Sequence, residues 1–464
     1  MRYFFETYGC QMNKAESAAL ELILAERGWE STIQPETADM VIINTCSVRL
    51  TAENRAWGRI AHYAALKRQH SFILVVTGCM AERLKKKMLE KQPQIDYVLG
   101  NFQKQAFALV VDAAADGRII PDIEESPQFT FAASHYEKGA FKAFVPIMHG
   151  CNNFCSYCIV PYVRGREISR NPLAILLEIL QMAEQGVREV ELLGQNVNSY
   201  NWLDGISIPA DYPLDNPLAA KAQVQLVALL DCGAMDFPSL LAWLAEILGG
   251  SSIGRIRFVS SHPKDLSERT IDVLAKYPIF ARHIHLCVQH GSNRILQAMN
   301  RKYTVEKYLE LVNALRKKIP EITLSTDILI GFPGETEEDV QATLQLLETV
   351  RFAYAYMYYF NPREGTPAAE MDTQLSMVDK KQRLARIISV QRAISQTVMQ
   401  ERVGQTVQIL AEGLSRKSSS ELLGRTEQDM MVVCKGDSSL IGSFINVKLE
   451  TLRGTTFKAR LVED

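Results

Sequence analysis

The chain has 464 residues, of which 47% are hydrophobic and 22% are charged, and its formal net charge is −2. A chain of this length exceeds what one hydrophobic core supports, so we expect two to four domains. The composition excludes intrinsic disorder, a collagen-like repeat and a coiled-coil rod as descriptions of the whole chain. Because the net charge is close to zero, any binding of nucleic acid would depend on local basic patches.

The first 118 residues alternate between strand and helix patterns. In chain order the predicted elements are a strand at 2–10, a helix at 13–27, a strand at 40–46, a helix at 50–68, a strand at 72–79 and a helix at 81–91. Strands that alternate with helices favour a parallel sheet with right-handed crossovers. We therefore predict a small α/β domain over residues 1–118.

One cysteine stands at or just beyond the end of each of these strands, namely Cys10, Cys46 and Cys79. Because the carboxyl ends of parallel strands share one edge of an open sheet, the topology would bring the three thiols together. Three ordinary buried cysteines are the alternative. The chain has nine cysteines in all, and an odd number scattered this widely favours metal binding or catalysis over a disulfide framework.

The amino terminus lacks the pattern of a secretory signal peptide, since Glu6 interrupts its apolar run and no small-residue cleavage site follows. No run of about 18 apolar residues is free of charge, so we expect no membrane span. The expectation is a cytoplasmic protein, in which thiols stay reduced.

Residues 137–390 repeat the alternation of strands and helices. The predicted strands lie at 145–149, 189–193, 255–260, 283–289, 323–330 and 353–360, and the predicted helices include 172–185, 240–248, 305–318 and 337–347. Six such units predict a partial (β/α)6 barrel with its site at the carboxyl ends of the strands. Residues 203–237 have three prolines and no clear period, so we interpret them as an inserted loop.

The last part of the chain changes character. A long amphipathic helix is predicted at about 379–401, and residues 400–464 then show short β runs, such as 406–410 and 444–449, between Gly, Ser and Lys. This pattern predicts a small β-barrel of OB-like size. The fold class is therefore α/β and multidomain.

Cys151, Cys155 and Cys158 form a CxxxCxxC motif directly after the first barrel strand. A structural zinc site uses four ligands, whereas this loop offers three. A [4Fe–4S] cluster held by three cysteines keeps one iron open for another ligand. The spacing, with Tyr157 before the last cysteine, resembles that of the radical S-adenosylmethionine superfamily. The resemblance implies that S-adenosylmethionine binds the open iron and that the reduced cluster cleaves it to a 5′-deoxyadenosyl radical.

Further segments resemble the methylthiotransferases of that superfamily and extend the similarity over nearly the whole chain. They are TYGCQMNKAES (7–17), INTCSVR (43–49), VTGCMAER (76–83), GCNNFCSYCIVPYVRGREISR (150–170), LLGQNVNSY (192–200), SSHPKDL (260–266), AMNRKYT (298–304) and TDILIGFPGETEEDV (326–340). TYGCQMN, RGREISR and LGQNVNSY are most similar to the MiaB branch, the tRNA methylthiotransferases.

The resemblance implies two [4Fe–4S] clusters. Cys151, Cys155 and Cys158 would hold the radical cluster and act in catalysis, and Cys10, Cys46 and Cys79 would hold an auxiliary cluster that carries the sulfur. Two molecules of S-adenosylmethionine would serve, one as methyl donor and one as radical source. The implied reaction places a methylthio group on C2 of N6-isopentenyladenosine at position 37 of tRNA, beside the anticodon.

The cofactor contacts are predicted at the ends of the barrel strands. For S-adenosylmethionine they are Tyr157, Gly194, Gln195, Asn196, Ser260, Ser261 and Gln289. Ordinary strand-end turns are the alternative for each of the strand-end residues. The implied partners are tRNA, an electron donor such as flavodoxin or ferredoxin, and a sulfur source; we expect a monomer and no membrane.

The RNA contacts are predicted on basic residues in two places. They are Arg164, Arg166 and Arg170 beside the radical motif, and Arg416, Lys417, Arg425 and Arg453 in the carboxyl-terminal piece. That piece resembles the TRAM domain, a small RNA-binding barrel. The target adenine would have to leave its stack to reach the barrel mouth.

Several residues fall outside these patterns. Cys287 and His290 stand where members of the family more often have proline and serine, and Cys232 and Cys434 belong to no motif. Two alternatives keep the chemistry but change the substrate, to threonylcarbamoyladenosine in tRNA or to an aspartate of a ribosomal protein. A third alternative, from another class, is a non-catalytic RNA-binding metalloprotein.

Overall fold

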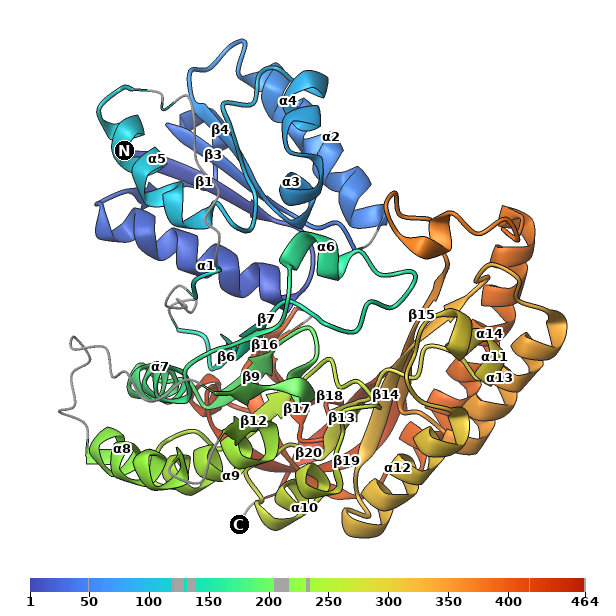
Figure 1. Ribbon diagram of the computed structural model, residues 1–464. Coiled ribbons are helices and arrows are strands. Elements are labelled where there is room, and N and C mark those ends of the chain that lie inside the picture. The colour runs from blue at the N-terminus through green and yellow to red at the C-terminus, as the bar shows by residue number, and fades with distance from the viewer. Residues whose placement is uncertain are drawn as a thin grey trace. The chain divides into compact units, whose positions relative to one another are not determined.

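A computed structural model describes residues 1–48, 50–118, 120, 129–131, 139–203, 217–230, 234–416 and 418–462 (Figure 1). The chain forms two compact units. The first comprises residues 1–137, 148–154 and 158–170, and the second comprises residues 138–147, 155–157 and 171–464. Among the described helices, none combines the length and the apolar character that crossing a bilayer requires.

The first unit contains a five-stranded parallel sheet in the order β2-β1-β3-β4-β5. Its elements are β1 (Arg2–Thr7), α1 (Gln11–Glu26), β2 (Glu30–Ser31), η1 (Pro35–Thr37), β3 (Met40–Thr45), α2 (Leu50–Leu66), β4 (Ile73–Gly78), α3 (Cys79–Leu84), α4 (Lys86–Lys91), β5 (Tyr97–Leu99), η2 (Lys104–Ala106), α5 (Phe107–Ala115), β7 (Met148–His149), α6 (Val160–Arg164) and β8 (Ile168–Ser169). The predicted α/β sheet domain is confirmed.

Helices cover both faces of this sheet, as the hydrophobic runs in its strands require. Side chains of α1 and α5 share one core with alternate residues of the strands, and side chains of α2, α3 and α4 share the opposite core. All six residues of β3 are buried. The single helix predicted at 81–91 is instead two helices, because Lys85 between α3 and α4 has a φ of 42°.

The second unit begins with the βα barrel. Its elements are β6 (Lys142–Pro146), α7 (Pro172–Glu184), β9 (Glu189–Leu193), η3 (Val197–Ser199), β10 (Asn201–Trp202), α8 (Pro217–Leu230), β11 (Met235–Asp236), α9 (Phe237–Leu248), β12 (Arg255–Phe258), α10 (Glu268–Lys276), β13 (His283–His285), α11 (Asn293–Ala298), α12 (Val305–Lys318), β14 (Thr323–Ile330), α13 (Glu337–Val350), β15 (Tyr354–Tyr359), η4 (Pro367–Ala369) and α14 (Met377–Gln400).

Six parallel strands follow one another around this barrel in chain order. β6, β9 and β12 pair in one half, and β13, β14 and β15 pair in the other. Parallel bridges from Ile256 to Phe280 and from Ser261 to Leu286 join the halves. The predicted partial (β/α)6 barrel is confirmed.

The prediction of a loop over 203–237 is wrong in part. Helix α8 occupies Pro217–Leu230, and β11 and the start of α9 follow it. Pro217 is the first residue of α8, where proline is tolerated because its missing N–H has no partner within the helix. Residues 204–216 and 231–233, including Cys232, lie outside the described residues.

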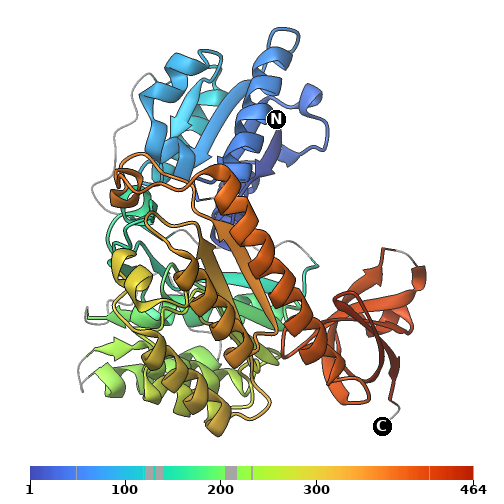
Figure 2. The same ribbon diagram turned by 90° about the vertical axis from the view of Figure 1, so that its right-hand side faces the viewer.

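The chain ends in a closed five-stranded barrel, to which the long helix α14 leads (Figure 2). Its elements are β16 (Thr406–Ser415), β17 (Ser418–Thr426), β18 (Met431–Lys435), η5 (Ser438–Leu440), β19 (Phe444–Arg453) and β20 (Thr456–Leu461), and the strand order is β16-β17-β18-β20-β19. The predicted small β-barrel is confirmed.

The turn between β17 and β18 contacts the amino ends of the βα-barrel strands. Arg257 on β12 donates to the carbonyl oxygens of Thr426 at 2.5 Å and Glu427 at 2.9 Å. The Tyr354 hydroxyl on β15 donates to the Asp429 carboxylate at 2.9 Å. The carboxyl ends of the strands, where we predicted the cofactor site, are at the opposite end of the βα barrel.

Candidate functional site

The first candidate site is the edge of the five-stranded sheet where β1, β3 and β4 end. These three strands are neighbours, and Cys10, Cys46 and Cys79 follow their last residues by three, one and one positions. A Cβ on Gly9 would lie 2.8 Å from the Cβ of Cys46, so the chain before Cys10 lies directly against Cys46. The structure thus brings the ends of the three cysteine-bearing strands to one edge, as predicted.

N–H groups donate to two of the three sulfurs. The Val48 N–H donates to Cys46 Sγ at 3.3 Å, and the Asn101 amide donates to Cys79 Sγ at 3.7 Å. Cys46 and Cys79 are each only 3% exposed. N–H donors directed at sulfur stabilise the thiolate form, which is the form that binds metal.

Arg164 supplies a buried positive charge at the same edge. It is 3% exposed, its Nη1 donates to Glu16 at 2.6 Å, and its Nη2 donates to Asn13 Oδ1 at 3.1 Å. Burial lowers the pKa of Arg164, but negative charge on Cys79, Glu16 and Cys10 raises that pKa well above its usual value. The prediction that Arg164 contacts RNA stays a prediction; its burial and pairing favour a role beside the cysteines.

The second candidate site is the CxxxCxxC segment. Gly150, with a φ of 78°, begins it, and a Cβ at that position would lie 1.9 Å from the Arg166 carbonyl oxygen, so only glycine fits. The Cys151 N–H donates to the Gly165 carbonyl at 3.1 Å. Cys151 and Cys155 are each 8% exposed, and Cys158 is half-buried.

Arg301 holds the sulfur of Cys155. Its Nη1 donates to Cys155 Sγ at 3.3 Å, its Nη2 donates to the Cys287 carbonyl at 2.8 Å, and its Nε donates to the Tyr303 hydroxyl at 3.0 Å. Arg301 was not among the predicted site residues, although it lies within AMNRKYT. Its position as an arginine in a segment that resembles the family could have indicated Arg301 as a site residue.

The residues predicted to bind S-adenosylmethionine lie directly after successive barrel strands. Gly194, Gln195 and Asn196 follow β9, Ser260 and Ser261 lie after β12, and Gln289 lies after β13. Tyr157 packs against a separate hydrophobic cluster around Phe332 and Phe360. The backbone φ values of Ser260 and Gln289 are 65° and 69°, an unusual region that is often found at functional sites.

Several polar atoms of this strand-end group lack a hydrogen-bond partner within the described part of the chain. They are Gln195 Oε1, Asn196 Oδ1 and Ser261 Oγ, and both amide atoms of Asn198 join them. Asn196 and Ser261 are at most 1% exposed. Since buried polar atoms in native proteins are almost always paired, these atoms fit a polar ligand such as the amino acid and ribose groups of S-adenosylmethionine.

The other basic residues that we predicted to contact RNA differ in exposure. Arg166, Arg416 and Arg453 are exposed. Arg170 is 6% exposed, and Arg425 forms an ion pair with Asp429 at 3.1 Å. Lys417 lies outside the described residues. The exposed guanidinium groups are the ones available to a phosphate backbone.

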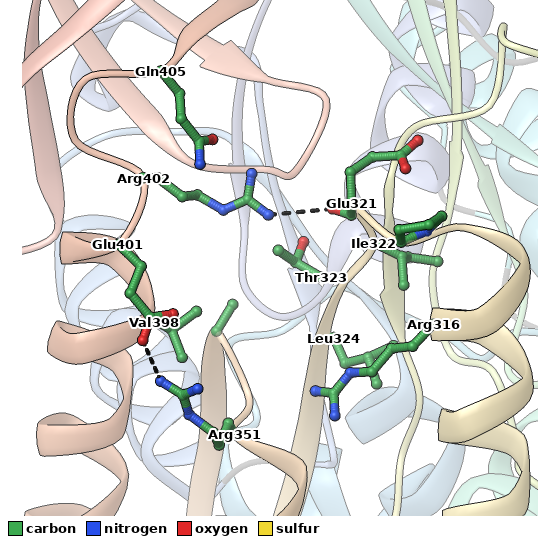
Figure 3. Close-up of a pocket in the computed structure, with 12 residues that line it drawn as sticks. Arg316, Glu321, Ile322, Thr323, Leu324, Arg351, Val398, Glu401, Arg402 and Gln405 are labelled. Atoms are coloured by element: carbon green, nitrogen blue, oxygen red, sulfur yellow. Dashed lines mark hydrogen bonds and ion pairs between the residues drawn. The ribbon is translucent and has the colours of Figure 1, made fainter.

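A cavity of about 400 Å³ lies elsewhere, near the amino ends of β14 and β15 and the start of β16 (Figure 3). Three arginines line it, but each is already bonded: Arg351 pairs with Glu401 at 2.6 Å, Arg402 donates to the Glu321 carbonyl at 3.2 Å, and Arg316 donates to a backbone carbonyl. Because sites of βα barrels lie at the carboxyl ends of the strands, we do not take this cavity as the reaction site.

Three family matches divide the chain. Residues 2–100 match the Uncharacterized protein family UPF0004, residues 145–347 match the Radical SAM superfamily, and residues 400–462 match the TRAM domain. The first range contains the edge with Cys10, Cys46 and Cys79, the second contains the βα barrel from the end of β6 through β14, and the third contains the carboxyl-terminal barrel.

Several relatives that match over their full length share one name. A tRNA-2-methylthio-N(6)-dimethylallyladenosine synthase of Treponema denticola is 45% identical over 99% of this chain and 100% of its own length. Proteins of the same name from Treponema pallidum and Alkaliphilus oremlandii are 44% and 39% identical, each over 100% of this chain and over 99% and 93% of their own lengths.

Among solved structures, the radical S-adenosylmethionine methyltransferase TsrM from Kitasatospora setae, with cobalamin and a [4Fe–4S] cluster bound, has a similar fold. The TM-score is 0.57 at 15% sequence identity, over 79% of this chain and 77% of that one. At this identity the similarity concerns the fold alone.

Proposed function

Since this chain belongs to the family of the tRNA-2-methylthio-N(6)-dimethylallyladenosine synthases, we propose that it is a radical S-adenosylmethionine tRNA methylthiotransferase. It replaces the hydrogen on C2 of N6-isopentenyladenosine at position 37 of tRNA with a methylthio group. Full-length identity of 39–45% to proteins of this name does not favour threonylcarbamoyladenosine or a ribosomal protein as the substrate.

One observation carries the proposal beyond the family relationship: a cysteine follows the end of each of three neighbouring parallel strands within three residues, and a separate segment supplies three more. Two sites with three thiolates each suit two [4Fe–4S] clusters, because each cluster then keeps one iron open. Cys10, Cys46 and Cys79 would hold the auxiliary cluster. Cys151, Cys155 and Cys158 would hold the radical cluster.

The bound clusters and S-adenosylmethionine would supply the radical, methyl and sulfur chemistry that side chains cannot perform on an aromatic C–H bond. Around the auxiliary site, Arg164 offsets the negative charge of the thiolates, and Asn101 and Val48 donate to sulfur. At the other site, Arg301 fixes Cys155 by a direct hydrogen bond. Arg164, Asn101 and Arg301 are each at most 8% exposed, and their burial limits the access of water.

The strand-end residues would orient the cosubstrate. Gln195, Asn196 and Ser261 present unpaired oxygens among buried surroundings, and such oxygens can accept from the amino group and hydroxyls of S-adenosylmethionine. Asn196 is itself held by its Nδ2, which donates to Asp265 Oδ2 at 2.7 Å. Because one end of the Asn196 amide is fixed, its free oxygen is held in one direction.

The RNA would be held by the carboxyl-terminal TRAM barrel and by exposed cations. Arg416 and Arg453 on that barrel, and Arg166 beside the radical motif, are exposed and suit phosphate contacts. The reaction also needs a low-potential electron donor such as flavodoxin or ferredoxin, and a source of sulfur. We propose that the enzyme acts as a monomer.

The test is a reaction without oxygen. Protein reconstituted with iron and sulfide is incubated with an isopentenylated anticodon-loop RNA, S-adenosylmethionine and dithionite, and nucleosides are analysed by mass spectrometry. We expect a 2-methylthio adduct together with 5′-deoxyadenosine. Both should disappear in Cys155→Ala but persist in the control Cys434→Ala, whose thiol is buried on β18 away from either motif.

A second variant separates the two sites. Cys79→Ala should retain S-adenosylmethionine cleavage but lose methylthio transfer, and its iron content should fall from about eight to about four per chain. If the wild type forms 5′-deoxyadenosine but no RNA product, the radical site stands and the proposed substrate is wrong. If zinc replaces iron in both sites, the protein is a non-catalytic metalloprotein and the proposal fails.

A further inference from the structure

The lumen side of strands β13 and β14 carries a column of polar side chains that the proposed reaction does not use. His283 and His285 lie two residues apart on β13, and their register partners on β14 are Thr323 and Ser325. Cys287 follows two residues beyond His285. Since side chains at alternate strand positions share a face, His285 and Cys287 project to the same side.

Two of these side chains, His285 and Cys287, converge with one further residue of β14, Asp327. The imidazole of His285, the thiol of Cys287 and the carboxylate of Asp327 each place one donor atom within 4.8 Å of the others. His285 Nε2 lies 3.5 Å from Asp327 Oδ2, and Cys287 Sγ lies 3.5 Å from the same oxygen. This group is separate in sequence from all six cysteines assigned to the clusters.

We propose that His285, Cys287 and Asp327 bind one zinc ion inside the βα barrel, with water as the fourth ligand. Nitrogen, sulfur and carboxylate oxygen are the donors that zinc takes in proteins, at about 2.0–2.3 Å. A tetrahedron with such bonds has ligand–ligand edges of about 3.3–3.8 Å. Both distances of 3.5 Å to the Asp327 oxygen match such an edge.

The same spacing is poor for a direct hydrogen bond between His285 and Asp327. A charge-assisted N–H···O bond has a length of about 2.7–2.9 Å, so 3.5 Å leaves the pair apart by more than half an ångström. A cation between the imidazole and the carboxylate removes this mismatch. At the other contact the Cys287 thiol donates to Asp327 Oδ2, and zinc would take the place of that proton because the thiolate is the form that binds metal.

Neighbouring groups hold the three donors in position. His285 Nδ1 lies 2.9 Å from Ser325 Oγ, so the other ring nitrogen, Nε2, is directed at Asp327. Such a second contact orients the histidine ligand in many metal sites. Arg301 and Tyr303 both donate to the Cys287 carbonyl, at 2.8 and 3.1 Å, and fix the backbone of the thiol.

The site has access for an ion. The side chains of His285 and Asp327 are 12% and 31% exposed, so the group is partly open and leaves room for a water ligand. Three protein ligands and one open position are typical of zinc sites that exchange their fourth ligand, whereas structural sites close all four. The zinc is additional to the clusters, and the inference does not rest on the proposed RNA reaction.

The test measures zinc in the reconstituted holoenzyme. Protein with both clusters loaded is incubated with one equivalent of zinc, passed through a desalting column and analysed for zinc and iron by mass spectrometry. We expect one zinc per chain in the wild type and in the control Cys434→Ser. In Cys287→Ser and in Asp327→Asn, zinc affinity should fall at least tenfold, with iron content unchanged.

Zinc-edge X-ray absorption then identifies the ligands of the bound zinc. It distinguishes zinc at the proposed site from zinc that has entered an empty cluster site. The proposed site gives one sulfur at about 2.3 Å and three nitrogen or oxygen neighbours at about 2.0–2.2 Å. Three sulfur neighbours would place the zinc on cluster cysteines and overturn the inference. So would a wild type that retains no zinc, or zinc retention that is equal in Cys287→Ser, Asp327→Asn and the wild type.

Discussion

Glu189 is the carboxylate on which the amino end of the βα barrel depends, and its replacement by glutamine gives a quantitative test of the fold. Glu189 has no exposed surface and accepts from Arg257 Nε at 2.8 Å and from Arg255 Nη1 at 3.1 Å, and Lys142 Nζ lies 3.4 Å away. Burial raises the pKa of Glu189, but these three cations lower it more, so its pKa is below the usual value. The carboxylate is therefore charged at neutral pH.

The size of the effect follows from what the cations can still bind. Removing one partner of a buried ion pair costs about 3–5 kcal/mol. In Glu189→Gln, Lys142 keeps Glu191 at 2.7 Å and Arg257 keeps the carbonyls of Thr426 and Glu427, so the loss lies at the lower end of that range. We expect about 3 kcal/mol, which lowers the Tm of a domain of this size by about 6–12 °C.

The assay is thermal unfolding followed by circular dichroism at pH 7.5, with Glu348→Gln as the control. Glu348 is exposed on α13, and surface substitutions stay within about 0.5 kcal/mol. Because the pKa of Glu189 is lowered in the folded state, its stabilisation is present above the unfolded carboxyl pKa and is lost as the pH falls through the folded value. The difference between wild type and Glu189→Gln should shrink below about pH 4. A Tm within 2 °C of the wild type at pH 7.5 would refute the reasoning.

Two further substitutions test the sites. Gly78→Ala places a Cβ 2.4 Å from both Asn44 Oδ1 and the Thr45 carbonyl oxygen at a φ of 96°. We expect the free energy of unfolding to fall by about 2–5 kcal/mol and iron to be lost from the auxiliary cluster. In the control Gly28→Ala, at a φ of 73° with nothing within 4 Å, the free energy of unfolding should fall by only about 1 kcal/mol in the same melting assay. Arg301→Lys removes the guanidinium group that donates to Cys155 Sγ. Because hydrogen bonds to sulfur favour the reduced state, the reduction potential of the radical cluster should become more negative. A redox titration followed by electron paramagnetic resonance measures this potential. An unchanged potential would contradict the assignment of that hydrogen bond.

The strands and their order could be predicted because their hydrophobic runs are continuous. β9 at Glu189–Leu193 and β14 at Thr323–Ile330 have the predicted bounds, and β3 at Met40–Thr45 differs by one residue. Buried parallel strands produce this signal because both of their faces are covered. The meeting of Cys10, Cys46 and Cys79 at one edge followed from the topology without any local signal.

Other features had no signal in a single sequence. Helix α8 follows a segment with two prolines and itself begins at Pro217, and its amphipathic pattern is weak, so residues 217–230 were interpreted as loop. The burial and the ion pair of Arg164 could not be predicted either, because its partner Glu16 lies 148 residues earlier in the chain. A basic residue beside a reactive motif predicts RNA binding as readily as it predicts a buried ion pair, and burial distinguishes the two.

The amino end of the βα barrel explains why the carboxyl-terminal barrel is more than an attached RNA-binding module. A closed βα barrel fills its interior with branched apolar side chains, whereas this partial barrel places Glu189, Arg255 and Arg257 at the ends of its strands. One carboxylate cannot satisfy two guanidinium groups with five donors each. Three further hydrogen bonds go to the carbonyl oxygens of Arg425 and Thr426 at the end of β17 and of Glu427 in the turn that follows. The turn thus supplies acceptors that the strands lack, and the second unit gains its stability from both barrels together.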